Sequence, residues 1–308
     1  MIKPLVVAAL LAAAPALADG FTPPTAPKSR SMQLATPAGG PLIFRGAVAI
    51  SPPERWFGGL SGLAMEGPGV AIAISDTGDW FRIALQIENG RLVGVESIIA
   101  ARMLDAEGSP LPGGARDAEG LARDPESGRL WVSYEGRHRI LAFDQPGGPT
   151  RARIQHPEWA HFSKNRGIEA LARDVDGQLW AIGEGDSGAV FTIWIDGREG
   201  WKTKTIPRRG SYRPTGADFG PDGWLYVTER AFSVFRGFRF RLRRFRWGDG
   251  AAPLEEETLL DFGAETDIDN IESVALWREA DRTYLFIASD DNFLPIQRNI
   301  LALFEVVG

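Results

Sequence analysis

The chain has 308 residues, a formal net charge of −6 and no cysteine. The lack of cysteine excludes disulfides, thiolate metal sites and a cysteine nucleophile. The mildly acidic balance argues against nucleic acid as a partner, because nucleic-acid binding relies on basic surfaces. A chain of this length forms one large all-β domain or two ordinary domains.

Residues 1–18 have the pattern of a secretion signal. Lys3 supplies a positive charge, residues 5–14 form an apolar run, and Ala16-Leu17-Ala18 is a small-x-small cleavage site. The apolar run is too short to cross a bilayer, and no later segment reaches about 18 apolar residues. We therefore expect a protein without a membrane span, periplasmic or secreted after cleavage before Asp19. A retained N-terminal anchor is the alternative.

Residues 19–40 are rich in Pro, Gly, Ser and Thr, which predicts a flexible lead-in. Residues 41–308 then repeat one pattern five times. Each copy has an apolar run, a turn marked by Gly or Asp, and an aromatic-rich run that ends in an acid. The copies begin at residues 61, 119, 169, 215 and 272, about 46 to 58 residues apart. This spacing matches one four-stranded propeller blade with its connections.

The second copy shows how one repeat becomes a blade. Residues 120–122, 130–134 and 139–143 are apolar runs separated by turns, and 151–154 is a weaker fourth run. Strands spaced by about 8–12 residues without a helical period indicate consecutive antiparallel hairpins. Asp-Gly turns, which favour hairpins, recur in the third and fourth copies. Radial repetition of such sheets is a β-propeller.

We predict an all-β fold, a single β-propeller domain of five blades over residues 41–308. A sixth, degenerate blade hidden in 91–116 or 145–166 is the alternative. The last copy offers only three strands, and the run 42–50 precedes the first copy without a blade of its own. Pairing of this N-terminal strand with the C-terminal blade would close the ring.

Corresponding residues of the inner strands form rings around the central channel of a propeller. The first ring, at the start of the inner strands, consists of Ser61, Glu119, Glu169, Thr215 and Glu272. Carboxylates that point into a narrow channel repel one another, and their unpaired burial is costly. A bound divalent cation removes that cost. An oxygen-only ligand set suits Ca²⁺, and Asp269 and Asn270 add further hard oxygens.

The second ring lies where the second strand of each copy ends. It consists of Asp76, Glu135, Glu184, Glu229 and Asp290, although Arg230 aligns more strictly than Glu229 in the fourth copy. The end of the second strand lies beside the start of the first in an antiparallel pair, so we expect both rings at one end of the channel. A single acid at a strand end is ordinarily a solvated turn residue, but five at one position favour a functional face.

Arginines accompany these acids. Arg116, Arg166 and Arg213 each lie two or three residues before the first ring. Guanidinium groups bind phosphate or carboxylate in bidentate fashion, so a mouth with acids and arginines is suited to a metal together with an anionic substrate. The alternative is that each arginine neutralises its local glutamate.

Other motifs for hydrolytic chemistry are weak. The three histidines show no HExxH or paired spacing, and no GxSxG motif supports a serine hydrolase. His138, three residues after Glu135, and His161, in a long connection, are candidate bases, with a surface role as the alternative. The aromatic and basic run 238–247 is either a polyanion-binding stripe or a strand with a basic solvated face.

The copies as a set resemble the bacterial "esterase-like activity of phytase" family, the phytase-like domain. The resemblance covers about residues 41 to 306. It rests on the ordered motifs GLSGLAMEGPGVAIAISDTGDW, RDAEGLARDPESGRLWVSYEGRHRI, NRGIEALARDVDGQLWAIGE, YRPTGADFGPDGWLYVTERAF, IDNIESVAL and SDDNFLPIQRNILALFEV. It implies an exported propeller associated with the hydrolysis of phosphate or carboxylic esters.

The motifs carry over a set of polar residues from the family pattern. These are Asp76, Asp117, Glu119, Glu135, Arg137, His138, Glu169, Glu184, Glu229, Arg230, Asp269, Asn270, Glu272, Asp290, Asp291 and Asn292. Ser273 stands where the pattern leads us to expect glycine after the glutamate, a departure that leaves the carboxylate of Glu272 intact.

The main hypothesis is a monomeric, Ca²⁺-dependent hydrolase that acts on a small anionic ester of phosphate or carboxylate. Ca²⁺ would be held by Glu119, Glu169 and Glu272. Asp76, Glu135, Glu184 and Asp290 would complete the coordination or act as general base, with His138 as a further candidate, and Arg116, Arg166 and Arg213 would orient the anion. The alternatives are a non-catalytic binding propeller with a structural Ca²⁺, and a lactonase of the gluconolactonase or paraoxonase type.

Overall fold

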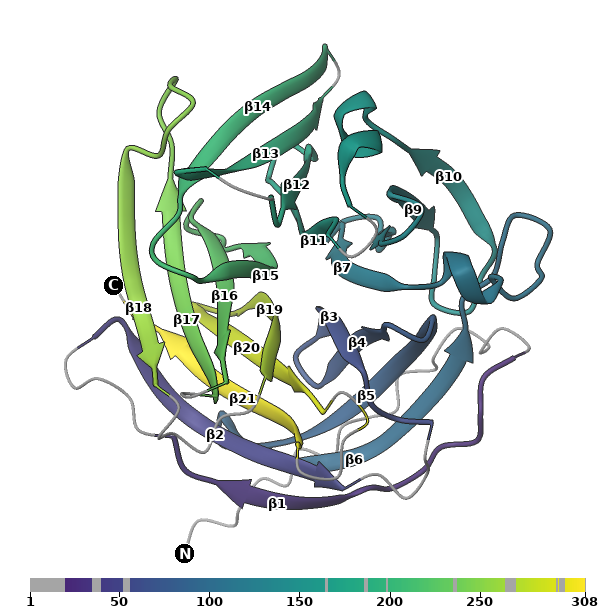
Figure 1. Ribbon diagram of the computed structural model, residues 1–308. Helices are drawn as coiled ribbons and strands as arrows, with labels where there is room; N and C mark the ends of the chain where they lie inside the picture. Colours follow the sequence, from purple (N-terminus) through teal and green to yellow (C-terminus); the bar gives the residue numbers. More distant parts are fainter. Residues whose placement is uncertain are drawn as a thin grey trace, which may run out of the picture.

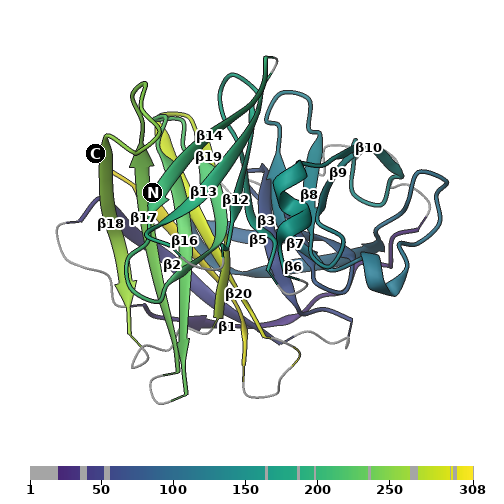
Figure 2. The same cartoon turned by 45° about the horizontal axis from the view of Figure 1, so that its top comes forward.

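The computed structural model describes residues 20–34, 40–51, 56–163, 166–185, 188–197, 199–234, 237–263, 270–291, 293 and 297–307. Within these residues the strands form five antiparallel sheets arranged radially around one channel (Figure 1). Figure 2 shows strands of these blades running from one face of the propeller to the other. No helix in the described part of the chain is long and apolar enough to cross a membrane.

In blades 1 to 4 the first strand is innermost and the next three follow outward in chain order. Blade 5 combines C-terminal and N-terminal strands. Blade 1 contains β3 (Leu60–Gly67), β4 (Val70–Ser75), β5 (Asp79–Glu88) and β6 (Arg91–Arg102). Blade 2 contains β7 (Ala118–Arg123), β8 (Leu130–Tyr134), β9 (Arg139–Phe143) and β10 (Thr150–Ile154). Blade 3 contains β11 (Ile168–Arg173), β12 (Leu179–Gly183), β13 (Val190–Gly197) and β14 (Gly200–Pro207).

Blades 4 and 5 complete the ring. Blade 4 contains β15 (Arg213–Phe219), β16 (Leu225–Ser233), β17 (Gly237–Arg246) and β18 (Glu255–Phe262). Blade 5 contains β19 (Asn270–Glu279), β20 (Arg282–Asp290), β21 (Asn299–Val306), β2 (Leu42–Ser51) and β1 (Lys28–Met32), in this order from the channel outward. Two 3₁₀ helices, η1 (Gly113–Ala115) and η2 (Pro157–His161), lie in connections.

The prediction of five blades is confirmed. Residues 91–116 form β6 and η1, and the described part of 145–166 forms β10 and η2, so neither stretch adds a blade. The predicted closure is also confirmed, because β2 pairs antiparallel with β21. Gly46, at the irregularity in β2, has φ +117°, and a Cβ there would overlap the carbonyl oxygen of Leu92 in β6. Close packing of β2 on β6 therefore requires this glycine.

Part of the predicted flexible lead-in is ordered structure. Residues 28–32 form β1, which pairs with β2. Before β1, the backbone N–H of Thr22 donates to the carbonyl of Ala100 at 2.8 Å, and Thr25 forms a bridge with Ile98 in β6. The free edges of β2 and β6 offer backbone hydrogen-bonding groups that need partners, and this polar segment supplies them. Composition alone does not reveal such edge pairing.

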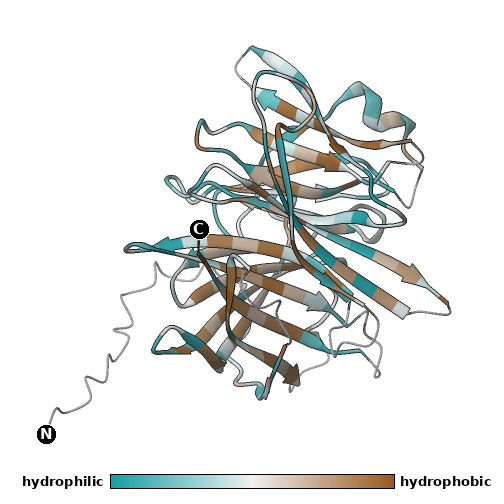
Figure 3. Ribbon diagram, turned by 90° about the vertical axis from the view of Figure 1, so that its left-hand side faces the viewer, coloured by the Kyte–Doolittle hydropathy of each residue, from teal (hydrophilic) through white to brown (hydrophobic). Residues whose placement is uncertain are grey.

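The core is divided into clusters that lie between neighbouring blades. Figure 3 shows the hydrophobic stretches along the strands and hydrophilic ones near many turns. Three tryptophans pack between blades: Trp131 lies in the cluster between blades 2 and 3, Trp180 between blades 3 and 4, and Trp224 between blades 4 and 5. These clusters pack neighbouring blades against one another, so that the inner strands stand side by side around the channel.

Candidate functional site

Every inner strand has a β-bulge at the residue of the first ring. The strand register shifts around Ser61, Glu119, Glu169, Thr215 and Glu272. A bulge leaves one residue unpaired and re-aims its side chain. The non-acidic members use this position to link blades: the Ser61 hydroxyl donates to the Ala118 carbonyl at 2.6 Å, and the Thr215 hydroxyl donates to the Ile271 carbonyl at 3.2 Å. The three glutamates carry carboxylates at the same level.

The second ring lies beside the first, at the same end of the channel. The backbone N–H of Asp76 donates to Gly59, that of Glu135 to Asp117, and that of Glu184 to Gly167, at 3.1, 2.9 and 3.1 Å. In blade 4, Arg230 of β16 is the strand partner of Arg213 in β15, and in blade 5, Asp290 of β20 is the strand partner of Asn270 in β19. The fourth position of the ring is therefore an arginine. Asp290 is buried at the end of β20.

Glu229 does not belong to the channel opening formed by the two rings, which we call the mouth. It lies one position earlier in β16, where its side chain is fully buried within blade 4 and paired with Arg241 and Arg243. Arg243 also pairs with Glu256 at 2.6 Å. The basic run 238–247 is therefore not the solvated basic face expected from its pattern, because Arg241, Arg243 and Arg244 are buried. Strand alternation puts Arg241 and Arg243 on one face of β17, but it does not show that Glu229 and the neighbouring strands cover that face.

The closest group of carboxylates comes from blade 2. Asp117, Glu119 and Glu135 each place one oxygen within 4.8 Å of the others, a spacing suited to a shared metal ion. Burial and the charges of Glu169 and Asp117 raise the pKa of Glu119 well above its usual value. Burial and the same Asp117 raise the pKa of Glu135 to about 7. These acids destabilise one another when ionised, and a divalent cation would relieve that repulsion.

Two further acids surround this group. Burial and the charge of Glu184 raise the pKa of Glu169 to about 8. Burial and the charge of Asp117 raise the pKa of Asp76 to about 6. The Oδ1 atom of Asp76 is buried without a hydrogen-bond partner among the described residues. A buried carboxylate oxygen without a donor is suited to a cation, so the oxygen-only donor set fits Ca²⁺.

The structure gives Glu272 and Asn270 a different partner from the one expected. The Arg230 guanidinium forms an ion pair with Glu272 and donates to Asn270 Oδ1 at 2.8 Å. Asn270 Nδ2 in turn donates to Glu272 Oε1 at 2.5 Å. Of the predicted metal ligands, Glu272 and Asn270 are thus engaged by an arginine, whereas Asp117, to which the sequence assigned no role, joins the carboxylate group. Asp269 lies outside the described residues.

The three predicted arginines have different surroundings. Arg213 pairs with Glu184 of blade 3 at 3.2 Å and donates to the Gly185 carbonyl at 3.0 Å. Arg116 lies close enough to Asp76 for its charge to oppose the rise in the pKa of that acid. The charge of Arg166 acts on Arg208. Arg208 follows β14 and lines a pocket with Arg213 and Arg230. It was not identified as a site residue from the sequence. The sequence feature that pointed to it was the pair of adjacent arginines before the fourth copy.

His138 reaches the mouth, whereas His161 is exposed at the end of η2. A Cβ atom at Gly167 would lie 3.2 Å from His138 Nδ1 and 3.3 Å from Glu135 Cγ, so both side chains lie against this glycine. Burial lowers the pKa of His138, which favours the neutral imidazole. Its Nδ1 has no hydrogen-bond partner among the described residues. A neutral imidazole beside Glu135 is a second proton acceptor at the mouth.

A comparison with known families identifies the chain. The family model described as "Phytase-like: Esterase-like activity of phytase" matches residues 55–293, which is more than half of the sequence. The chain belongs to this family. Every position of the two rings, including Arg230 in blade 4, lies inside the region matched by the phytase-like model. No match was found among curated proteins.

Several solved structures have a similar fold to this phytase-like protein. A luciferin-regenerating enzyme is 11% identical over 92% of this chain and 95% of its own, with a TM-score of 0.45. A protein assigned as a gluconolactonase is 13% identical over 89% and 95%, with a TM-score of 0.43. The Kuenenia stuttgartiensis hydrazine synthase is 13% identical over 79% of this chain and 62% of its own, with a TM-score of 0.41.

The raised pKa values of the acids around the channel opening predict that stability depends on pH. In metal-free protein the folded state keeps protons on Glu169, Glu135 and Asp76 that the unfolded chain has already released, so stability falls as pH rises from about 4.5 to about 8. A divalent cation held by these residues would need their ionised carboxylates, so any stabilisation by added Ca²⁺ should grow over the same window. Thermal denaturation with chelator and with Ca²⁺ across this range measures both trends. An equal Ca²⁺-induced shift at both ends would contradict this prediction.

Proposed function

We propose that this phytase-like protein is a Ca²⁺-dependent hydrolase of phosphate or carboxylic esters. The observation that carries the proposal is the convergence of Asp117, Glu119 and Glu135, within 4.8 Å, at a mouth that also contains arginines. Asp76 and Glu169 would complete the oxygen ligands. When bound, Ca²⁺ would supply Lewis-acid polarisation of the ester and of a water.

The chain's own residues have complementary roles in this proposal. Glu135 would bind Ca²⁺ or accept the proton of the attacking water, and the neutral imidazole of His138 beside it is a second acceptor. Arg213 and Arg230 would hold the anionic part of the substrate. Their partners Glu184 and Glu272 hold the two guanidinium groups in place.

Removal of the metal tests the proposal. Turnover of an aryl phosphate, an aryl carboxylic ester and a lactone is measured before chelation, after chelation and after the return of Ca²⁺. We expect chelation to lower ester turnover at least about 100-fold and Ca²⁺ to restore it. Turnover that is indifferent to chelator refutes the metal-dependent mechanism. A preference for the lactone would favour the lactonase, and loss of stability without any turnover would favour a binding propeller.

The proposal includes the cellular location. Residues 1–18 have the pattern of a secretion signal and lie outside the described residues. We propose that they direct export and are removed, so that the enzyme acts as a monomer in the periplasm or outside the cell. An extracellular compartment also suits weak Ca²⁺ sites, which bind at about 10⁻⁴–10⁻³ M.

A further inference from the structure

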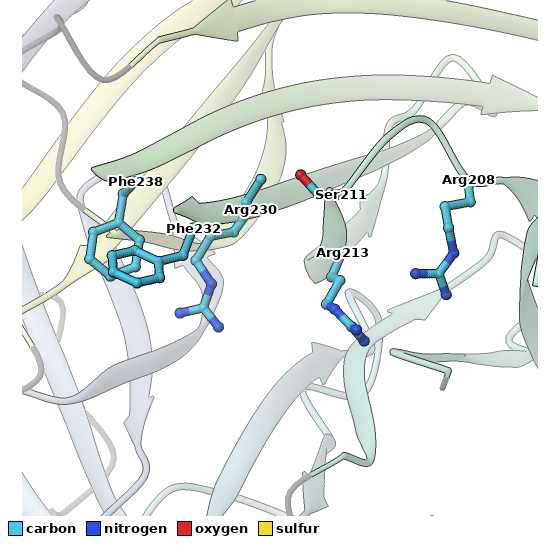
Figure 4. Close-up of a pocket in the computed structure, with 7 residues that line it drawn as sticks. Arg208, Ser211, Arg213, Arg230, Phe232 and Phe238 are labelled. Carbon is cyan, nitrogen blue, oxygen red and sulfur yellow. The ribbon is translucent and has the colours of Figure 1, made fainter. Parts of the chain in front are cut away.

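A pocket of about 520 Å³ opens between the segment that follows β14 and strands β15 to β17, and two of its arginines pair with Glu184 and Glu272. Three arginines, Arg208, Arg213 and Arg230, line it together with Ser211, Phe232 and Phe238. In Figure 4 the three guanidinium groups point to the same side of the ribbon, and the two phenylalanine rings lie next to Arg230. Because Arg213 and Arg230 also belong to the level of the second ring, the pocket is continuous with the mouth.

The charges of this pocket are not balanced. Arg213 pairs with Glu184, and Arg230 pairs with Glu272. Arg208 has no such pair: its Nε and one terminal nitrogen are buried without a hydrogen-bond partner among the described residues. Its guanidinium stacks 4.2 Å above the ring of Phe191, which holds it in position. Guanidinium nitrogens without acceptors are costly, and because Arg208 also lines the pocket, an anion bound there would balance its charge.

The protonation behaviour of Arg208 agrees with this geometry. Burial and the positive charge of Arg213 lower its pKa from the usual value. The two cations therefore repel each other in the protein without ligand, and an anion between them would stabilise both. The carboxylates of blade 2 and the arginines around blade 4 thus divide the mouth into an acidic part and a basic part.

The aromatic pair adds a second kind of contact. Phe232 and Phe238 are direct partners across the β16–β17 hairpin, and their ring centroids are 4.9 Å apart. The Phe232 side chain is 59% exposed. A large exposed aromatic side chain at the rim of a pocket is suited to cover a flat apolar group of a ligand.

We propose that this pocket binds an organic oxyanion, with phosphate or carboxylate oxygens on Arg208, Arg213 and Arg230 and a flat apolar group on Phe232 and Phe238. The inference rests on the proposed hydrolase and names its substrate class: an ester that carries an anionic group and an aromatic or similarly flat group. Arg208 is then a substrate-binding residue that turns the basic part of the mouth into a specific anion site.

Binding of phosphonates tests this without turnover, because a phosphonate has no ester bond. Calorimetric titration of chelator-treated and Ca²⁺-loaded protein with phenylphosphonate, methylphosphonate and benzoate compares the probes. We expect phenylphosphonate to bind more tightly than methylphosphonate in both preparations. Arg208→Gln should weaken phenylphosphonate binding at least about 10-fold, as for a lost charge-assisted hydrogen-bond pair, and Arg208→Lys should weaken it less. Benzoate binding of comparable strength would show that carboxylates are accepted as well as phosphates.

Matched variants make the outcome decisive. Arg209 is the adjacent arginine, is 57% exposed and pairs with Glu256 outside the pocket, so Arg209→Gln should leave binding within about twofold. Phe232→Ala, at an exposed position, should weaken phenylphosphonate but not methylphosphonate. Equal effects of the Arg208 and Arg209 variants in folded protein, or no phenylphosphonate binding, overturn the inference. Absence of ester turnover with intact phenylphosphonate binding would refute only the proposed function.

Discussion

Replacing Glu229 with glutamine is expected to lower the free energy of unfolding by about 3–5 kcal/mol, because it leaves buried arginines without their shared anion. Glu229 and Arg243 are both 0% exposed, and Glu229 Oε2 also accepts from Arg241 Nε at 2.7 Å. The glutamine retains the size of the side chain but not its charge. Chemical denaturation of the variant and the wild type measures the loss.

A surface ion pair in the same blade is the control for this prediction. Glu255 pairs with Arg246 at 3.3 Å, and both side chains are more than 40% exposed. Glu255→Gln should therefore change stability by less than about 1 kcal/mol. Because Glu229 does not belong to the mouth, the folded Glu229→Gln protein should bind Ca²⁺ as the wild type does. A loss below about 1 kcal/mol for Glu229→Gln would contradict the buried network.

Glu119→Gln is expected to separate activity from stability. The variant should lose at least about 100-fold in ester turnover and in Ca²⁺ affinity, because it removes a charge from the central carboxylate group. Metal-free variant protein should be more stable than metal-free wild type, because the neighbours Glu169, Asp117 and Glu135 already disfavour a charge at this position. Turnover, calcium titration and thermal denaturation of the same preparations check the three effects.

Glu126→Gln is the matched control in the same blade. Glu126 is exposed in the turn between β7 and β8, away from the mouth, so its neutralisation should change none of the three measurements appreciably. Wild-type turnover in Glu119→Gln would refute the assignment of this carboxylate to the metal site. A drop in the stability of the metal-free variant would show instead that Glu119 has a structural role as an anion.

The repeated hairpins made the fold predictable because their signals are local. Turns such as Asp176-Gly177 and Asp222-Gly223 and the apolar runs beside them specify antiparallel pairs within each copy. The closing strand was predictable because blade 5 lacked a partner that residues 42–50 supply. The pairing of residues 22–32 with the edges of β2 and β6 was not predictable. A polar segment pairs with a free strand edge through its backbone, whatever its composition.

The candidate site was predictable only in part. Alignment of the copies placed the first ring correctly at one level, where the structure has five bulges. It also indicated Arg230 as the strict fourth member of the second ring. It did not show that Arg230 pairs with Glu272, that Asp117 joins Glu119 and Glu135, or that Arg208 and Arg213 line one pocket. These contacts join residues of different blades, or residues in connections whose conformation the repeat pattern does not specify.

The sequence by itself determined the number of blades, their closure and the height at which the acids stand, since strand period and turn chemistry act over a few residues. The tertiary structure alone decided which charges meet. Glu229 and Arg230 are neighbours in the chain, yet one is buried in a blade and the other faces the channel, because successive residues of a strand point to opposite faces. Ion pairs such as Arg230–Glu272 and Arg213–Glu184 join neighbouring blades. They depend on how the blades pack, and no local sequence pattern encodes which side chains then meet.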